Sequence, residues 1–123
     1  ELNEFTILKM EIMSLDETKL YQCQSALKAN FDLLLTSSVR GNLEITHKAA
    51  NKGAALSFIL ERLKLSKEEV IIFGDSMNDK SMFEVAGLAI AMGNASDELK
   101  QYADEVTLDH NENGIPHALK KLL

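Results

Sequence analysis

The sequence is poor in cysteine, in net positive charge and in long hydrophobic runs, and each shortage excludes a class of protein. The single cysteine, Cys23, rules out an internal disulfide framework and fits a reducing cytoplasm, where we expect the protein. The formal net charge of −6 at pH 7 argues against a nucleic-acid partner, because such binding depends on a basic surface. No run is apolar and long enough to span a bilayer, and no signal-peptide pattern occurs, so we expect no membrane partner.

The remaining composition is that of an ordinary globular protein in a short chain. The 123 residues are 46% hydrophobic and 26% charged, which suits one domain, or part of one, with a modest core. Internal repeats, low-complexity tracts and flexible linkers are also missing from the sequence. The chain begins at Glu1, in the middle of a pattern and without Met, so we expect it to be a fragment of a longer protein.

Residues 1–48 have the pattern of an α+β unit with an antiparallel sheet. Apolar and polar residues alternate in the first segment, which predicts a half-buried strand, and Ser14–Glu17 has the form of a capping box that starts a helix. Cys23 falls on the apolar face of that helix, which predicts a small core residue rather than a reactive thiol. The elements predicted here are a strand over residues 4–13, a helix from 14 to 29, and strands over 31–36 and 43–46.

Residues 49–123 alternate strands with helices, which predicts an α/β fold with a parallel, doubly wound sheet. The apolar run 70–73 predicts a strand that is buried on both faces, as in a parallel sheet. The predicted elements are a helix over 52–63 that buries Leu56, Ile59, Leu60 and Leu63, the strand 70–73, a helix over 78–85, a strand over 88–92, a helix capped by Asn94 that runs to 101, a strand over 105–108 and a helix over 115–123.

Polar side chains follow the predicted strand 70–73 at once. Asp75 is the first side chain beyond the strand end, and Asn78 and Asp79 lie one helical turn further on. Because ligands of open α/β sheets bind outside the carboxyl ends of the strands, these groups can hold Mg²⁺ and meet a phosphate oxygen. The alternative, which stays open here, is that Asp75 or Ser76 only caps the next helix.

Lys52 lies at the start of a predicted helix, where the helix dipole favours anions rather than cations. One interpretation is a solvated surface lysine. The other is an ammonium group that pairs with a phosphoryl group and with a carboxylate beside the metal. The sequence alone leaves both open.

Other polar groups in the sequence predict no site. The run Leu35–Arg40 has the hydroxyls and the arginine of a phosphate site after a strand, but its antiparallel context favours polar turn chemistry. The run Asp109–Gly114 opens like an EF-hand loop, but Lys120 stands where that loop needs a bidentate Glu. The three histidines have no metal-ligand spacing; they are His47, His110 and His117.

A series of short motifs follows in fixed order between residues 51 and 115. They are Asn51-Lys52-Gly53, the run Val70–Asp79, Ala86-Gly87, Ala91-Met92-Gly93-Asn94-Ala95, Ala103-Asp104-Glu105-Val106-Thr107 and Asn113-Gly114-Ile115. Together they resemble the C-terminal half of the Cof-type phosphatases of the haloacid dehalogenase-like superfamily, over about residues 43–123. The resemblance implies the C-terminal half of a Rossmannoid parallel sheet over residues 49–123, preceded over residues 1–48 by the C-terminal part of an α+β cap domain.

The resemblance also implies roles for individual residues. Members of this family hydrolyse phosphate monoesters through a phospho-aspartate and require Mg²⁺. Asp75 matches their metal-binding carboxylate, and Asp79 matches a second acidic position that supports the metal or the lysine. Lys52 matches the lysine that steadies the nucleophile and the phosphoryl group, and Asn78 matches an amide near the phosphate. Gly93–Asn94 is expected at the edge of the site. The implied substrate is a small phosphorylated molecule, such as a sugar phosphate.

One departure from the family pattern concerns the nucleophile. The family carries it in an Asp-x-Asp-Gly-Thr motif, on the strand beside the one that ends at Asp75, and this sequence contains no such motif. Asp16-Glu17-Thr18 lacks the second Asp, and Thr36-Ser37-Ser38 does not replace the family's phosphate-binding Thr or Ser motif. We therefore expect a phosphatase fragment that is inactive alone.

The missing strand leaves a second hypothesis open. Without it, the strand 70–73 has an unpaired apolar edge, which favours association with another chain. The chain is then either an enzyme part that pairs with a missing N-terminal segment, or a non-catalytic module that pairs its edge with another chain, for instance as a homo-oligomer.

Overall fold

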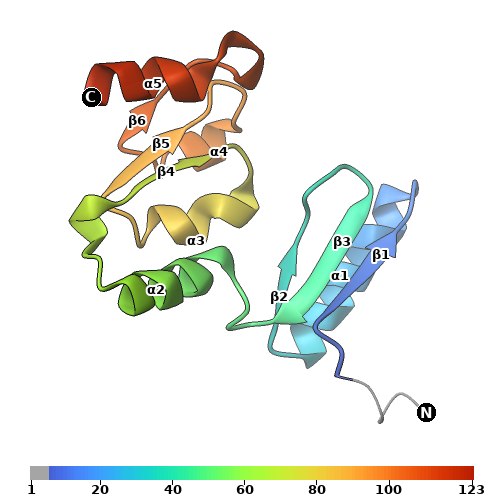
Figure 1. The fold of residues 1–123 in the computed structure, drawn as a ribbon. Coiled ribbons are helices and arrows are strands. Elements are labelled where there is room, and N and C mark those ends of the chain that lie inside the picture. The colour runs from blue at the N-terminus through green and yellow to red at the C-terminus, as the bar shows by residue number, and fades with distance from the viewer. Residues whose placement is uncertain (1–5) are drawn as a thin grey trace. The chain divides into compact units, whose positions relative to one another are not determined.

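The computed structural model describes residues 6–123, and the chain divides into two compact units, one ending at Asn51 and the other beginning at Lys52 (Figure 1). Unit 1 consists of β1 (Lys9–Met13), α1 (Glu17–Asn30), β2 (Leu33–Thr36) and β3 (Asn42–His47). Its strands lie in the order β1-β3-β2, and both neighbouring pairs are antiparallel. The predicted α+β unit with an antiparallel sheet is therefore confirmed.

The first strand and the first helix of unit 1 begin later than predicted. β1 begins at Lys9 rather than at residue 4, and residues 4 and 5 lie outside the described part of the chain. The N-cap of α1 is Asp16, whose Oδ1 accepts a hydrogen bond from the Lys19 backbone N–H at 3.2 Å. Ser14 is not the cap, because its hydroxyl accepts from the Asp16 N–H instead. The predicted capping box was therefore wrong, since the helix is capped by Asp16 rather than by Ser14.

The hydrophobic side of the unit 1 sheet lies under α1. Leu43 and Ile45 of the central strand β3 are 4% and 3% exposed. Cys23 is half-buried on the inner face of α1, as predicted for a small packing residue. The turn between β2 and β3 is polar, as predicted, since Asn42 Oδ1 accepts hydrogen bonds from the Ser37 hydroxyl and the Ser38 N–H.

The other side of the same sheet carries a polar network around Glu44. Its Oε1 accepts a hydrogen bond from the Ser38 hydroxyl at 2.6 Å and pairs with Lys9 Nζ at 2.9 Å. The Ser38 hydrogen bond, with the Lys9 contact second, holds the pKa of the Glu44 carboxyl below its usual value. Both contacts favour the ionised carboxylate.

Unit 2 is built around a three-stranded parallel sheet in the order β4-β5-β6. This parallel sheet with connecting helices confirms the predicted α/β class. The elements are α2 (Lys52–Leu63), η2 (Lys67–Glu69), β4 (Ile71–Gly74), η3 (Met77–Asp79), α3 (Lys80–Phe83), β5 (Leu88–Ala91), α4 (Asp97–Lys100), β6 (Glu105–Val106), η4 (His110–Glu112) and α5 (Gly114–Leu122).

A small core joins the sheet of unit 2 to its helices. Phe83 of α3 is 6% exposed, and Leu99 of α4 is fully buried. The helices α2 and α3 meet at Gly53, where an added Cβ would lie 2.1 Å from the Ser81 carbonyl oxygen. Only glycine permits this approach of the two backbones. The buried residues of this core are Ile72, Phe83, Ala89, Ala91, Ala95 and Leu99.

The prediction that β4 is buried on both faces was wrong. β4 lies at the end of the strand order, so one of its edges pairs with no other described strand, and Ile71 is 40% exposed. Two residues predicted on the inner face of α2, Ile59 and Leu63, are 49% and 62% exposed. Leu60 is buried as predicted.

Two further elements of unit 2 differ from prediction. Asn94 does not cap α4; the N-cap is Ser96, whose hydroxyl accepts from the Leu99 N–H at 3.3 Å. The last strand covers Glu105–Val106 only, rather than 105–108. Asn94 is therefore free of the capping role and makes other contacts. None of the helices in the described part of the chain is both long and apolar enough to cross a membrane.

Candidate functional site

The predicted site residues of unit 2 lie where β4 ends. The strand stops at Gly74, and Asp75 is the first residue beyond it, followed by the short helices η3 and α3. The loops after β5 and β6 reach the same end of the sheet, because all three strands are parallel (Figure 1). The carboxyl end of such a sheet is the usual ligand-binding edge.

Asp79 is the buried carboxylate at the centre of this group. Its side chain is only 7% exposed. Its Oδ2 accepts hydrogen bonds from the backbone N–H groups of Asp75 at 3.1 Å and Ser76 at 3.2 Å, while Oδ1 pairs with Lys52 Nζ. Two amide donors and an ammonium group balance a charge that would otherwise be costly to bury.

Gly74 makes room for this carboxylate. A Cβ on Gly74 would lie 2.8 Å from Asp79 Cβ and 2.7 Å from Phe83 Cε1. The strand end can therefore approach Asp79 closely only if residue 74 has no side chain. This explains why the apolar run breaks with a glycine directly before Asp75.

Lys52 reaches the site from the first residue of α2. The adjoining Gly53 N–H donates to the Ser81 hydroxyl at 3.0 Å, which fixes the start of α2 against α3. Lys52 Nζ pairs with Asp79 and lies 3.4 Å from Asn78 Oδ1. The structure thus brings three of the four predicted site residues together, and the half-exposed ammonium can still meet a ligand.

Asp75 is the more available of the two carboxylates. Its side chain is exposed, and its Oδ2 accepts a hydrogen bond from Asn94 Nδ2 at 3.1 Å. Among residues 6–123, no hydrogen bond to its Oδ1 occurs. Asp79, by contrast, uses both of its oxygens.

The donor set suits a hard cation only in part. Carboxylate and amide oxygens are the ligands that Mg²⁺ prefers, and one or two carboxylates suffice because Mg²⁺ keeps several waters and often binds phosphate as well. The described residues contain no group of three or more His, Cys, Asp or Glu side chains that could hold a metal. The residues fit Mg²⁺ as a partial coordination sphere, with Asp75 supplying the free oxygen.

The contacts of Asn94 were predicted only in part from the sequence. Asn94 was expected at the site edge and as a helix cap, whereas its amide connects Asp75 with the His110 backbone N–H, which donates to Asn94 Oδ1 at 3.2 Å. No signal for the His110 contact exists in the sequence, because it depends on how two loops approach each other. The motif Gly93–Asn94 was the available hint.

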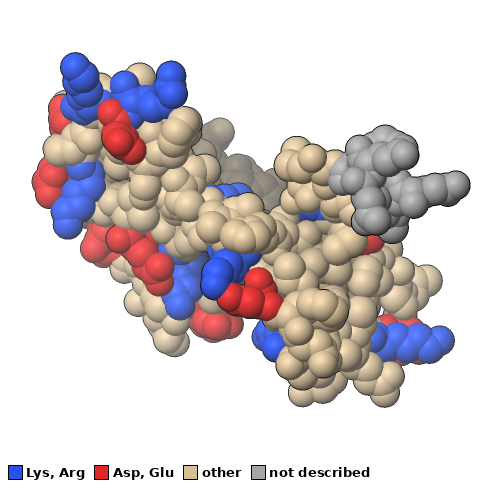
Figure 2. Space-filling model, turned by 90° about the horizontal axis from the view of Figure 1, so that it is seen from below, with Lys and Arg blue, Asp and Glu red and all other residues tan. Residues whose placement is uncertain are grey.

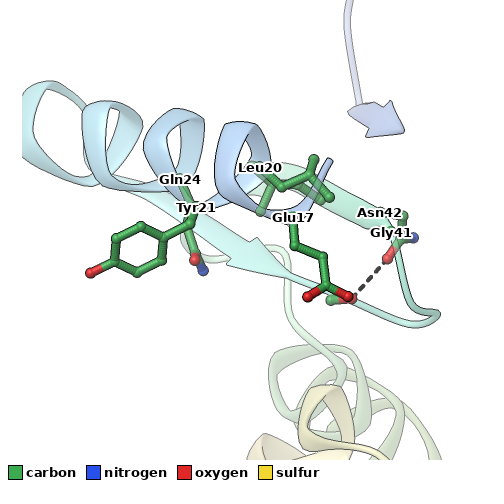
Figure 3. A pocket seen from close by; sticks show the side chains of 8 residues that line it. Glu17, Leu20, Tyr21, Gln24, Gly41 and Asn42 are labelled. Carbon is green, nitrogen blue, oxygen red and sulfur yellow. Dashed lines mark hydrogen bonds between the residues drawn. The ribbon is translucent and has the colours of Figure 1, made fainter. Parts of the chain in front are cut away.

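Unit 1 contains a separate small pocket between α1 and the β2–β3 hairpin (Figure 3). Its volume is about 240 Å³, below the range of about 300–1,000 Å³ that is usual for drug-sized ligands. None of the predicted site residues takes part. The residues that line it are Glu17, Leu20, Tyr21, Gln24, Ser37, Gly41, Asn42 and Leu43.

Figure 2 shows one face of the molecule, on which acidic and basic side chains are interspersed. This agrees with the net charge of −6.

Comparison with known proteins identifies close relatives. A protein-family model described as haloacid dehalogenase-like hydrolase matches residues 1–119. The phosphatase YwpJ of Bacillus subtilis is 47% identical over 92 residues, which cover 75% of this chain and 32% of the phosphatase. A solved haloacid dehalogenase-like hydrolase from B. subtilis has a TM-score of 0.86 at 40% identity, covering 94% of this chain and 41% of the other. A sugar phosphatase of subclass IIB has a TM-score of 0.84 at 26% identity, covering 97% and 44%.

These matches cover much of this chain but less than half of each relative. The chain spans 32% of the length of YwpJ, and 41% and 44% of the two solved chains. The likeness confirms the predicted resemblance and the predicted α/β fold class.

Proposed function

The chain belongs to the haloacid dehalogenase-like hydrolases, and from that membership we propose that it is the C-terminal part of a Mg²⁺-dependent phosphatase that hydrolyses small phosphate monoesters. Sugar phosphates are the substrate class we favour, since a structural relative is a sugar phosphatase. The proposed localisation is cytoplasmic, which agrees with the single cysteine in the sequence.

A single observation carries this proposal: the group of Lys52, Asn78 and Asp79 beside the exposed Asp75. The Lys52 ammonium is paired with the buried Asp79, and its Nζ lies 3.4 Å from Asn78 Oδ1. A cation and an amide thus lie in contact at the carboxyl end of β4, and the first residue beyond that end carries an exposed carboxylate. Phosphoryl transfer requires such fixed charges, because negative charge on the phosphoryl oxygens must be stabilised as the bond to the leaving oxygen breaks.

Each residue has a distinct proposed role. Lys52 binds a phosphoryl oxygen and stabilises the charge that develops on it. Asn78 orients the same phosphoryl group through its amide. Asp79 pairs with the Lys52 ammonium, so that this ammonium is in place before the substrate binds. Asp79 also fixes the loop after β4 by accepting hydrogen bonds from the Asp75 and Ser76 N–H groups.

Asp75, with support from Asp79, is the proposed ligand of Mg²⁺. When bound, Mg²⁺ supplies a Lewis acid that withdraws charge from the phosphoryl oxygens. The contribution of the chain is a carboxylate with one oxygen free and the other fixed by Asn94. For the chain alone we expect weak Mg²⁺ binding, because only part of the coordination sphere is present.

The attacking group is the part that this sequence does not supply. The sequence contains no Asp-x-Asp-Gly-Thr motif, and the carboxylates of the described site already have other tasks. We therefore propose that the nucleophilic carboxylate comes from a segment outside this sequence, and that the chain alone does not turn over substrate.

The first test is hydrolysis of a chromogenic phosphate monoester by the purified chain, with Mg²⁺ and with EDTA. We expect no turnover from the chain alone and Mg²⁺-dependent turnover once a segment with the missing motif is added. EDTA-sensitive turnover by the chain alone would contradict the proposed inactivity. Failure of the completed protein on every small phosphate monoester would contradict the phosphatase assignment.

In the completed protein, site variants test the individual roles. We expect Asp75→Asn to abolish Mg²⁺-dependent turnover and Lys52→Ala to lower kcat by about 100-fold or more, as for other losses of a charge-stabilising donor. Lys120→Ala, an exposed lysine in the last turn of α5, is the matched control and should retain activity. Normal rates in either site variant would remove that residue from the proposed machinery.

A second candidate function is a non-catalytic module that associates through its sheet edge. The observation that favours it is the unpaired edge of β4 together with the exposed apolar side chains of Ile71, Ile59 and Leu63. An unpaired apolar strand edge promotes pairing with another chain. A stable oligomer that stays inactive after every complementation would favour this function over the enzyme.

A further inference from the structure

The loops that follow the three parallel strands of unit 2 are joined through a single side chain. Asp75 follows β4, Asn94 follows β5, and His110 lies after β6. Asn94 Nδ2 donates to Asp75 Oδ2 at 3.1 Å, and Asn94 Oδ1 accepts from the His110 N–H at 3.2 Å. Both ends of one amide are thus used, each on a different loop.

The amide of Asn94 suits both neighbours, because it has a donor at one end and an acceptor at the other. The Asp75 side needs a donor because a carboxylate only accepts, and the His110 side needs an acceptor because a backbone N–H only donates. Rotating the Asn94 amide by half a turn would set oxygen against oxygen and hydrogen against hydrogen. The two contacts therefore also fix which way the amide points.

The backbone next to Asn94 is itself held in place. The Gly93 N–H donates to the Leu108 carbonyl at 3.0 Å. An added Cβ on Gly93 would lie 2.6 Å from the Asp109 backbone nitrogen, so the loops after β5 and β6 approach too closely for any other residue. Asn94 consequently reaches Asp75 from a rigid support rather than from a free loop.

We propose that Asn94 is a positioning residue for Asp75: it fixes Oδ2 through its amide and leaves Oδ1 directed to the ligand side. The proposal rests on the proposed function, in which Asp75 binds Mg²⁺. A carboxylate on an exposed side chain can rotate about its own bonds, and a hydrogen bond to one oxygen restricts that rotation. Partners that orient a metal ligand in this way typically change metal affinity by about 10–100-fold when removed.

The test uses the chain itself and the metal alone, read by NMR. Mn²⁺, a hard cation of the same ligand preference, broadens the signals of nuclei near its site and so detects weak binding. In the wild-type chain we expect broadening centred on Asp75, and couplings that report one preferred Asp75 side-chain rotamer. In Asn94→Ala we expect averaged couplings and an ion affinity lower by about 10-fold.

The control is Asn111→Ala, an exposed asparagine of η4 whose backbone N–H donates to Asp109 Oδ1 and whose side chain makes no hydrogen bond within residues 6–123. It should leave both the rotamer and the affinity unchanged. An equal loss in Asn111→Ala would show a general effect on the loop and overturn the positioning role.

A reverse experiment keeps the inference falsifiable even if Asn94→Ala does not fold. Asp75→Ala should shift the side-chain amide signal of Asn94 and leave that of Asn111 in place. An unchanged Asn94 signal would overturn the proposed contact in solution.

Two further outcomes distinguish a failure of the Asn94 positioning role from a failure of the proposed metal site at Asp75. If ions bind at Asp75 and Asn94→Ala folds with an unchanged rotamer and affinity, the positioning role is wrong while the proposed function stands. If the wild-type chain shows no ion effect near Asp75 at any Mn²⁺ concentration, the metal assignment of the proposed function fails, and this inference fails with it.

Discussion

Asp79 is the residue on which the site geometry depends most. Its buried carboxylate accepts from two backbone N–H groups and pairs with Lys52, so one side chain holds both the loop after β4 and the start of α2. Such a carboxylate cannot be replaced by an amide of the same shape, because one end of the amide would present hydrogens to Lys52 or to the loop.

Asp79→Asn should therefore lower the free energy of unfolding by about 2 kcal/mol, the range for lost hydrogen bonds to charged groups, moderated by the partial exposure of Lys52. Urea denaturation of both proteins at neutral pH measures the difference. Asp97→Asn, an exposed acid in the first turn of α4, should cost much less. Equal losses in the two variants would argue against a special role for Asp79.

Glu44 gives a prediction about pH at the same scale. Its pKa is lowered by the Ser38 hydrogen bond and by Lys9, so the ionised form is favoured in the folded state. A lowered folded-state pKa adds stability above the ordinary carboxyl pKa, and this stability is lost as the pH falls through the folded-state value. At neutral pH, the free energy of unfolding of the wild-type chain should be about 1 kcal/mol higher than that of Glu44→Gln.

The two proteins should converge in stability as the pH falls through the acidic range below the usual carboxyl pKa. Urea unfolding at a series of pH values checks this. Glu61→Gln, an exposed acid on α2, serves as the control and should show no such convergence. A gap between wild type and Glu44→Gln that is constant with pH would contradict the prediction.

Among the elements, the contact between α2 and α3 decides where Lys52 lies. The two helices meet at Gly53, where an added Cβ would come within 2.1 Å of the Ser81 carbonyl oxygen. A backbone atom cannot yield as a flexible side chain does, so the helices would have to separate. Lys52 directly precedes Gly53 in α2, so its ammonium would move relative to Asp79.

Gly53→Ala should thus destabilise the chain by about 1–3 kcal/mol, the usual cost of overpacking, and weaken the Lys52–Asp79 pair. Thermal or urea unfolding gives the stability, and the Lys52 Nζ chemical shift reports on the pair. Ala55→Gly, at an exposed position of the same helix, should cost about 1 kcal/mol through helix propensity and leave the pair intact. A stabilising effect of Gly53→Ala would refute the close contact.

Elements with a clear periodicity could be predicted from the sequence, and their order in the sheet could not. The bounds of α2 were predicted correctly because apolar residues at helical spacing run through that segment. β4 was wrongly predicted to be buried on both faces, because the apolar run in its sequence says nothing about which strands lie beside it. The helical spacing of Ile59 likewise does not say what packs against that part of α2.

The candidate site also contains residues that the sequence could identify and a contact that it could not. Lys52 and Asp75 could be selected because chemistry and motif order both point to them. The role of Asn94 was partly missed, because asparagine before a helix is a good cap and the sequence offers no sign that Ser96 takes that place. A contact between loops after different strands follows only from the three-dimensional arrangement.

At the scale of the whole molecule, the unpaired edge of β4 predicts association. Sedimentation velocity of the chain over a range of concentrations should show an apparent mass that rises above that of the monomer. Ile71→Lys places a charge on this edge strand and should shift the distribution to monomer, since charged residues block edge pairing. Val106→Lys on β6, at the opposite end of the strand order, is the control.

Two results would contradict this prediction. A wild-type chain that remains monomeric at every concentration would show that the β4 edge is protected in solution. Dissociation by Val106→Lys but not by Ile71→Lys would place the association on the other edge of the sheet.

The division between the two units has a consequence for how such a protein can be inherited. The boundary lies between Asn51 and Lys52, so Lys52, Asn78, Asp75, Asp79 and Asn94 all belong to one side of it. A genetic crossover at this point would exchange unit 1 for a different unit while transferring the residues proposed for chemistry as one block. Variation of the preceding unit is thereby separable from variation of the residues proposed for chemistry.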